Sequence, residues 1–398
     1  MVFNSLGSNY NFGFATKALF LPSRKKDQDR LQKFLEHKYQ GRAVLLYKGR
    51  EAIALAMQIL NLPHQSTVAI NGYTCYAVYQ PIVEAGYKIE YLDINKNDLN
   101  FSAAELLKKL EAGSQIKAVV VQNTLGYACD IAAIAEICRE KNIVLIEDLA
   151  HSVGTVYKNG GEAGSFGDFV VLSFSQDKII DAVSGGALII RNKKYQNFEL
   201  PALARIKKSK IIKDRFYPTF TWKIRTNYSW GLGKLDHKIL KSLGLLSQPM
   251  GALEKIALHN LPGWYCALVL ENFKNLENNL QHRKSIAAIY THKLNPKCLI
   301  PQTTSQINNY SNLRFPILVE DRKSLINFLA KVGVHISDIW YDAPIAPQKY
   351  LTHTNYKGKC PEAEKISGTM LNLPTHINVS QKQAEKITQQ INLWLQSK

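Results

Sequence analysis

The stretch that decides the fold is Phe169 to Arg191, FVVLSFSQDKIIDAVSGGALIIR. Two apolar runs of strand length, FVVLSF and ALIIR, flank a polar loop that carries one lysine, Lys178. Such runs, bounded by glycine and polar residues, are typical of buried strands. Burial between strands lowers the pKa of a lysine and prepares its amine to attack a carbonyl carbon. The alternative is a surface hairpin with an ordinary solvated lysine, and this stretch alone favours neither interpretation.

Upstream of this stretch, apolar runs rich in Val and Ile alternate with helical patterns. The expected strands occupy residues 43–47, 66–70, 88–94, 117–123 and 143–148. Near-continuous apolar strands separated by helices predict an α/β fold, in which a mainly parallel sheet lies between two layers of helices. Ligands bind such sheets at the carboxyl ends of the strands.

Two groups of residues follow expected strands directly. Gly49 and Arg50 stand where the first strand passes into a helix, and a helix N-terminus attracts anions through its N–H groups and dipole. The alternative for Arg50 is a simple salt bridge with Glu51. Asp148 ends its strand, where a carboxylate is either a helix N-cap or a functional charge, and the residue type alone favours the cap.

At 398 residues the chain is long enough for two domains. We expect a large domain over residues 1–250 and a small α/β domain over 251–398, with a helical pattern from 250 to 290. The net charge of +18 is compatible with nucleic acid, an anionic membrane or phosphorylated small molecules, and also with compositional bias.

Residues 201–245 form an unusually basic and aromatic segment in which Asp214 and Asp236 are the only acids. Interleaved basic and aromatic side chains fit an anionic membrane surface or a polyphosphate. They are also compatible with nucleic acid, but no recognised module is present, so no nucleic-acid partner is expected. The alternative is a segment whose aromatic side chains pack against a partner subunit.

The six cysteines are scattered, without a CxxC pair or a Cys/His cluster, which favours reduced thiols and argues against a disulfide framework or a metal site. The N-terminal sequence lacks the basic start and apolar core of a signal peptide, and no apolar run reaches transmembrane length. We therefore expect a cytoplasmic protein, with peripheral membrane contact through residues 201–245.

Several motifs together resemble the DegT/DnrJ/EryC1/StrS family of aminotransferases. The spacing SFxxxK-x6-GG is matched by Ser173 to Lys178 followed by Gly185-Gly186. IEDLAHSVG (146–154), GSFGDF (164–169), the run from 71 to 94 and the run from 370 to 387 resemble further family motifs. The resemblance implies a fold type I PLP-transferase that binds pyridoxal 5′-phosphate (PLP). It also implies a homodimer with active sites at the subunit interface. Such enzymes pass an amino group from an amino acid, here expected to be glutamate, to a keto-sugar nucleotide or related glycan precursor.

The resemblance assigns a role to each matching residue. Lys178 would be the Schiff-base lysine, and Asp148 would pair with the pyridine nitrogen and keep it protonated. His151 would lie near the ring hydroxyl, where the family often has Gln. Ser173 and the backbone at Gly49–Arg50 would hold the phosphate.

The chain departs from the family pattern at three places. Lys48-Gly49-Arg50 replaces a Ser-Gly-Thr turn, although a guanidinium also binds phosphate. Cys75 replaces an aromatic residue that stacks on the cofactor ring, and Tyr76 is the nearest substitute. Ser247-Gln248-Pro249-Met250 replaces an Asn-x-Arg-Met run that reaches the partner's cofactor phosphate; Ser247 still offers one hydrogen bond. These changes predict retained PLP chemistry on an atypical acceptor, larger or membrane-associated.

Two other functions fit the same motifs. One is a PLP-dependent dehydratase or lyase acting on a sugar nucleotide, but dehydrating relatives replace the cofactor lysine with histidine, and this chain keeps Lys178. The other is a non-catalytic regulatory or binding protein that retains the fold. The presence of both Lys178 and Asp148 favours an enzyme.

Overall fold

The computed structural model describes residues 1–247, 254–336 and 341–397. Its centre is a seven-stranded sheet of order β2-β9-β8-β7-β6-β3-β5. Strand β9 is antiparallel to both of its neighbours, and the other pairs are parallel, which confirms a mainly parallel sheet. The strands are β2 (Arg42–Leu46), β3 (Thr67–Asn71), β5 (Lys88–Leu92), β6 (Ile116–Gln122), β7 (Val144–Asp148), β8 (Phe169–Ser173) and β9 (Gly186–Ile190).

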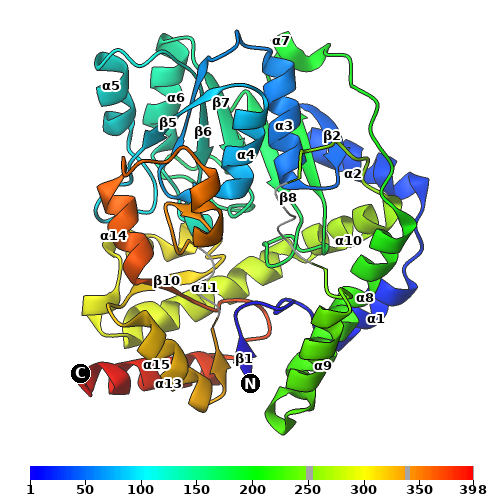
Figure 1. Ribbon diagram of the computed structural model, residues 1–398, viewed down its shortest axis with the longest axis vertical. Coiled ribbons are helices and arrows are strands. Elements are labelled where there is room, and N and C mark those ends of the chain that lie inside the picture. The colour runs from blue at the N-terminus through cyan, green and yellow to red at the C-terminus, as the bar shows by residue number, and fades with distance from the viewer. Residues whose placement is uncertain (248–253, 337–340, 398) are drawn as a thin grey trace.

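Helices flank this sheet in the upper part of the molecule (Figure 1). The helices around the sheet are α2 (Lys25–Tyr39), α3 (Gly49–Leu60), α4 (Tyr76–Glu84), α5 (Ala103–Glu111) and α6 (Ile131–Glu140). Helix α2 packs against β2 and β9, and helix α3 packs against β8 and β9. The expected α/β arrangement is therefore confirmed.

Strands β8 and β9 form the hairpin expected from the opening stretch. Their register pairs Phe169 with Ile190 and Ser173 with Gly186, and every residue of both strands is buried. Because β9 is also paired with β2, the hairpin lies inside the sheet. The interpretation of this stretch as a surface hairpin is wrong.

A second buried cluster lies in the lower part of the molecule (Figure 1). There β10 (Phe315–Leu318) pairs antiparallel with β13 (Met370–Leu373), and β1 (Val2–Phe3) pairs parallel with β11 (Val334–His335). The surrounding helices are α11 (Leu276–Lys293), α13 (Arg322–Lys331) and α15 (Gln381–Gln396). Thus the first residues of the chain pack with its last third. The division at 250/251 stays a prediction, since residues 248–253 lie outside the described part.

The helical pattern from 250 to 290 is only partly realised. Helix α10 (Gly263–Lys274) and α11 confirm its second half. Residues 254–262 are not helical, and the prediction is wrong there. Their backbone groups bond to distant segments: His259 bridges to Ala204, Asn260 bridges to Leu46, and the carbonyl of Glu254 accepts from Gln80. A backbone group bonded in this way is not available to an i→i−4 helical bond.

The basic aromatic segment folds into α8 (Lys208–Thr226) and α9 (Leu232–Ser242). Helix α8 packs on α1 (Phe12–Phe20), and α9 extends to the outer edge of the molecule, away from the sheet (Figure 1). None of the helices in the described part is long and apolar enough to span a bilayer.

Candidate active site

One cavity at the carboxyl ends of β6, β7 and β8 brings together most of the predicted site residues. Those lining it are Gly49, Arg50, Cys75, Asp148, His151, Ser173 and Lys178. They come from four separate stretches of sequence, which only the sheet topology brings together. The predicted residues Tyr76 and Ser247 are not among the described residues that line it.

Lys178 lies in the loop between β8 and β9, lines the cavity and is half-buried. Burial lowers the pKa of its amine to about 8. Acidic groups of Cys75, Asp148 and Asp177 oppose this shift. The sequence prediction of an amine with a lowered pKa is supported by this geometry.

Asp148 is the last residue of β7 and lines the cavity. Its Oδ1 accepts a hydrogen bond from the Ala150 N–H at 3.0 Å. A turn follows Asp148, so the helix N-cap interpretation is wrong. Burial raises the pKa of Asp148, while the Ala150 N–H and the charge of Lys178 act in the opposite direction.

His151 follows in the same turn and holds a defined tautomer. The Leu125 N–H donates to His151 Nδ1 at 3.2 Å, which leaves the ring proton on Nε2. Burial lowers the pKa of His151 well below its usual value, and the charges of Lys178 and Arg314 add to this effect. The neutral imidazole is therefore a hydrogen-bond donor through Nε2.

The N-terminus of α3 forms the other end of the cavity. Gly49 opens this helix, and a Cβ placed on it would lie 2.8 Å from Ser173 Cβ. A Cβ on Gly186 would lie 2.6 Å from the carbonyl carbon of Lys48. The two glycines thus allow β8, β9 and the turn before α3 to approach each other. Helix N–H groups and the Ser173 hydroxyl then face one space, an arrangement suited to a phosphate group.

Arg50 and Cys75 complete the wall near this end. The Arg50 guanidinium donates to Gln80 Oε1 at 3.1 Å. Its predicted alternative partner, Glu51, pairs instead with His259. Cys75 caps α4 and accepts from the Ala77 N–H at 3.4 Å.

Tyr76 is turned away from the cavity. Its ring packs on Tyr79 and Tyr350, with ring centroids 5.6 and 5.1 Å apart. It therefore does not take the place of the missing aromatic side chain. Tyr341, which the sequence reasoning missed, does line the cavity and contacts the His151 ring edge-on at 5.7 Å.

Ser247 joins a polar network behind the cavity. Its hydroxyl accepts from Lys210 Nζ at 2.9 Å, and Lys210 also pairs with Asp214 at 2.8 Å. The backbone carbonyl of Ser247 accepts a hydrogen bond at 3.3 Å from the side-chain amide of Gln176, which lines the cavity. Gln248, Pro249 and Met250 lie outside the described residues. The network shows that α8, the first helix of the basic segment, also supports the active site.

Two further residues were missed by the sequence analysis. Lys48 lines the cavity, donates to Ser184 Oγ at 2.7 Å, and has a pKa lowered to about 8 by burial. Gln122 lines it from the end of β6 and accepts from the Thr74 hydroxyl. Gln122 was detectable, because it stands at the carboxyl end of a predicted strand. For Lys48 the sequence predicted only its place in the Lys48-Gly49-Arg50 turn and no role in the site.

The cavity fits pyridoxal phosphate in its chemistry. It offers an amine with a lowered pKa, a buried carboxylate, an imidazole N–H, and a helix N-terminus that Gly49 lets approach Ser173 closely. Small apolar side chains lie between these groups; they include Ala77, Val78, Ala150 and Val171. Such walls suit a flat pyridine ring.

Comparisons with known proteins agree with this fit. A UDP-4-amino-4,6-dideoxy-N-acetyl-beta-L-altrosamine transaminase of Campylobacter jejuni is 25% identical over 81% of this chain and 78% of its own length. A pleiotropic regulatory protein of Geobacillus stearothermophilus is 24% identical over 86% and 82%. A Streptococcus pneumoniae protein solved in a PLP form superposes with a TM-score of 0.70 at 18% identity, over 96% of this chain and 95% of that one.

The family model of the DegT/DnrJ/EryC1/StrS aminotransferases matches residues 25–207 and 250–392. The match leaves out 208–249, the stretch that contains α8 and α9. The cofactor of this family is PLP, in agreement with the chemistry of the cavity. This chain therefore belongs to the DegT/DnrJ/EryC1/StrS aminotransferase family and is a PLP-dependent transaminase.

Proposed function

We propose that the enzyme transfers an amino group from glutamate to a keto group on a sugar nucleotide or a related glycan precursor. The observation that carries this proposal is the shared cavity of Lys178, Asp148 and the α3 N-terminus. It supplies a reactive amine, a ring partner and a phosphate site in one space. The acceptor class follows from relatives whose names specify sugar nucleotides, among them a GDP-perosamine synthase of Vibrio cholerae.

The proton-moving residues of this reaction are Lys178 and Asp148. When bound, PLP draws electrons away from the substrate carbon next to the transferred nitrogen. The Asp148 carboxylate would pair with the ring nitrogen and keep it protonated. Because its pKa is lowered to about 8, the Lys178 amine is unprotonated in a larger fraction of molecules near neutral pH than an ordinary lysine. In that form it would take a proton from the substrate carbon and return it to the cofactor.

The other cavity residues orient the cofactor. Ser173, Gly49 and Arg50 would hold its phosphate, and the Nε2–H of His151 would donate to its ring oxygen. A dehydratase would use the same cofactor site, but the retained amine of Lys178 favours amino transfer.

The test is an absorbance spectrum of the purified protein with PLP, taken before and after glutamate and then after candidate keto-sugar nucleotides. We expect a visible band from Lys178-bound cofactor that disappears with glutamate and returns with the acceptor. A colourless protein that takes up no PLP would overturn the proposal in favour of a non-catalytic regulatory role. A band that glutamate leaves unchanged, while a sugar nucleotide loses water, would favour the dehydratase.

We also infer a homodimer, as the family resemblance implies, and peripheral contact of α9 with an anionic membrane. Leu232, Leu235, Ile239 and Leu243 recur at spacings of three and four residues and are exposed, Leu243 to 64%. Trp230, just before the helix, is 76% exposed. A soluble monomer seldom exposes such a strip without a partner. We call these five residues the α9 strip.

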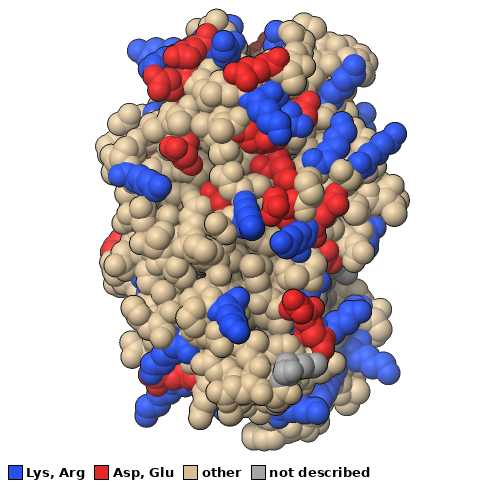
Figure 2. All heavy atoms as spheres, turned by 90° about the vertical axis from the view of Figure 1, so that its left-hand side faces the viewer, with Lys and Arg blue, Asp and Glu red and all other residues tan. Residues whose placement is uncertain are grey.

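Charge favours a lipid surface over a second copy as the partner of the α9 strip. Lys234, Lys238 and Lys241 are exposed along the same helix. In a two-fold dimer the same patch lies on both subunits, so these lysines would face each other and repel. An anionic bilayer accepts both the apolar side chains and the positive charges. For comparison, the face of the molecule on the side of α5 and α14 (Pro361–Thr369) carries positive and negative side chains mixed together (Figure 2).

Replacing Lys234, Lys238 and Lys241 with Gln is expected to weaken binding to phosphatidylglycerol vesicles about 100-fold, since each lysine near the surface contributes about 1 kcal/mol. The measurement is vesicle co-sedimentation, with phosphatidylcholine vesicles as the neutral reference. Leu235→Glu with Ile239→Glu should abolish binding. The matched control places glutamates at Leu107 and Leu393, exposed leucines on α5 and α15. Equal vesicle binding by all variants would contradict the membrane contact. A dimer that becomes a monomer in the Leu235→Glu/Ile239→Glu variant would also contradict it, because the α9 strip would then pack against a second copy of the chain.

A further inference from the structure

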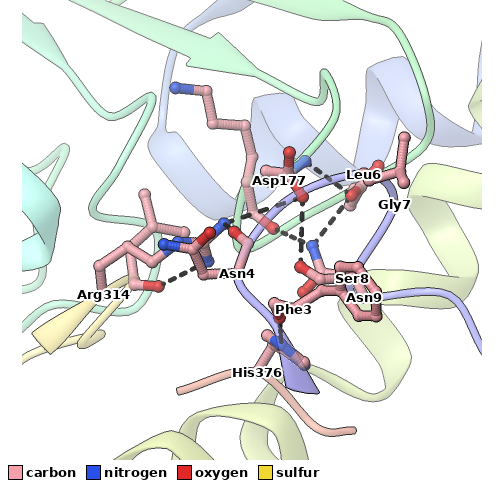
Figure 3. A network of polar contacts seen from close by, with 12 residues as sticks. Phe3, Asn4, Leu6, Gly7, Ser8, Asn9, Asp177, Arg314 and His376 are labelled. Carbon is pink, nitrogen blue, oxygen red and sulfur yellow. Dashed lines mark hydrogen bonds and ion pairs between the residues drawn. The ribbon is translucent and has the colours of Figure 1, made fainter. Parts of the chain in front are cut away.

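The loop that carries Lys178 rests on the first residues of the chain. We call residues 3–10 the N-terminal strap. Figure 3 shows this segment passing around Asp177, which immediately precedes Lys178. The Ser8 hydroxyl donates to Asp177 Oδ1 at 3.3 Å, and Asn9 Nδ2 donates to the carbonyl of Lys178 at 3.2 Å. The strap therefore touches the residue before the amine and the backbone of the amine's own residue.

Three backbone carbonyls of the loop are held by asparagine side chains. The pairs are Asn9 with Lys178 O at 3.2 Å, Asn279 with Ile179 O at 3.3 Å, and Asn272 with Asp181 O at 3.3 Å. Amide donors from the strap, α11 and α10 thus hold the loop backbone from outside the cavity. Asp177 and Val183 have positive φ values of 62° and 69°, conformations that non-glycine residues keep only when neighbours impose them.

Asp181 is the centre of this support. Its two carboxylate oxygens accept four hydrogen bonds: from Asn9 Nδ2 at 2.9 Å, Asp177 N–H at 2.8 Å, Val183 N–H at 3.1 Å and Tyr10 OH at 2.5 Å. Four donors match the ionised form of a carboxylate, which only accepts. Asp181 therefore ties both ends of the loop to the strap.

The strap is held in turn by four basic side chains. Arg225 of α8 donates to the carbonyls of Leu6, Gly7 and Tyr10. The remaining contacts are Arg283 with Asn9 Oδ1 at 3.1 Å, Arg314 with Asn4 O at 2.5 Å, and His376 with Phe3 O at 2.6 Å. Arg225 lies in the segment that the family pattern leaves out. The basic segment thus has a structural partner inside its own chain.

We propose that the N-terminal strap orients the Lys178 amine, with Asp181 as the positioning residue inside the loop and Arg225 as the residue that holds the strap in place. The strap's contacts fix the backbone on both sides of Lys178, so the direction of the side chain into the cavity depends on them. This inference rests on the proposed role of Lys178, and exchange in the cofactor-free protein tests it separately.

The ionisation of Asp181 explains why each donor matters. Burial, followed by repulsion from Asp177, raises the pKa of Asp181 to about 7. The hydrogen bonds from Tyr10, Asn9 and the Val183 N–H act in the opposite direction. Other charged or titratable groups that interact electrostatically with Asp181 are Tyr217, Arg225, Arg283 and Arg314. Loss of one donor therefore raises the pKa further, and a protonated Asp181 no longer accepts from all its partners.

Tyr10→Phe removes one donor to Asp181 and keeps the ring. We expect amide hydrogen exchange of the loop peptide 175–184 to become about 10-fold faster in the cofactor-free protein, the size of one hydrogen bond to a charged acceptor. We also expect a lower kcat with little change in the donor KM. The matched control is Tyr290→Phe, which removes a buried donor to the carbonyl of Pro374 in the second core cluster. Its loop exchange should equal that of the unchanged protein.

A second pair of variants covers the case in which Tyr10→Phe folds poorly. Arg225→Lys keeps the charge but not the guanidinium fork that holds three carbonyls. Arg322→Lys is its control, because Arg322 also bridges two carbonyls, those of Ser367 and Met370. Faster loop exchange in Arg225→Lys alone supports the proposal. Equal exchange in the members of each pair overturns it. If the variants change loop exchange but the protein takes up no PLP, the strap still positions the loop. In that case only the proposed chemistry is wrong.

Discussion

Replacing Lys178 with alanine is expected to lower kcat by about 10⁴-fold, the upper range for loss of a positioned acid–base group. The variant also loses the group that binds the cofactor covalently, so its visible cofactor band should disappear. Thermal stability should not fall, because burial already opposes the charged form of this amine. The measurements are single-turnover kinetics with glutamate and mass spectrometry after borohydride reduction, which locates the cofactor on the chain.

Lys48→Ala is the matched control for this result. Lys48 lines the same cavity, and burial lowers its pKa to about 8 as well. It stands beside the phosphate end, before α3, and donates to Ser184. We expect this variant to keep the reduced cofactor on Lys178 and to bind PLP more weakly. A cofactor found on Lys48 in the unchanged protein would contradict the assignment of Lys178.

Replacing Asp148 with asparagine is expected to lower kcat by about 10³-fold, because the amide cannot hold a proton at the ring nitrogen. The cofactor should still bind, since the asparagine oxygen still accepts from the Ala150 N–H. The charge of Asp148 raises the pKa of Lys178, so the variant should show a lower pKa for that amine. The pH dependence of chemical labelling of Lys178 in the cofactor-free protein measures this shift, and single-turnover kinetics measure the rate.

Asp168→Asn controls for loss of a carboxylate in the same sheet. Asp168 precedes β8 at the opposite end of the sheet and accepts from the Leu145 N–H and from Asn192. We expect a lower thermal stability with kcat within threefold of the unchanged protein, about 0.7 kcal/mol in barrier height. If both variants lost rate equally, the role given to Asp148 would be wrong.

The motif residues were predictable because their signals are local. Lys178 lies between two strand-length runs, and Asp148 ends another such run. Buried strands of a parallel sheet are read from apolar composition alone, and their carboxyl ends meet at one edge of the sheet. Both residues line the cavity as expected. The surface-hairpin alternative failed because sequence periodicity does not show that β9 would pair with β2 on its other side.

Other placements depended on partners far away in the sequence. Tyr76 follows the strand end as predicted, yet its ring packs with Tyr79 and Tyr350. Ser247 bonds to Lys210, a residue of α8. Residues 254–262 carry a helical pattern but bond to other segments. In each case a tertiary contact outweighed a local preference, whose free energy is small.

The sequence by itself indicated the fold class through its apolar periodicity and the cofactor through its motif spacing, because both signals act within a few dozen residues, and it predicted Lys178 as the reacting residue. Only the tertiary structure decided how that lysine is held. The strap, Asp181 and Arg225 are separated by up to about 220 positions along the chain. No local pattern encodes these contacts, since they arise when buried polar groups must find hydrogen-bond partners in the folded chain.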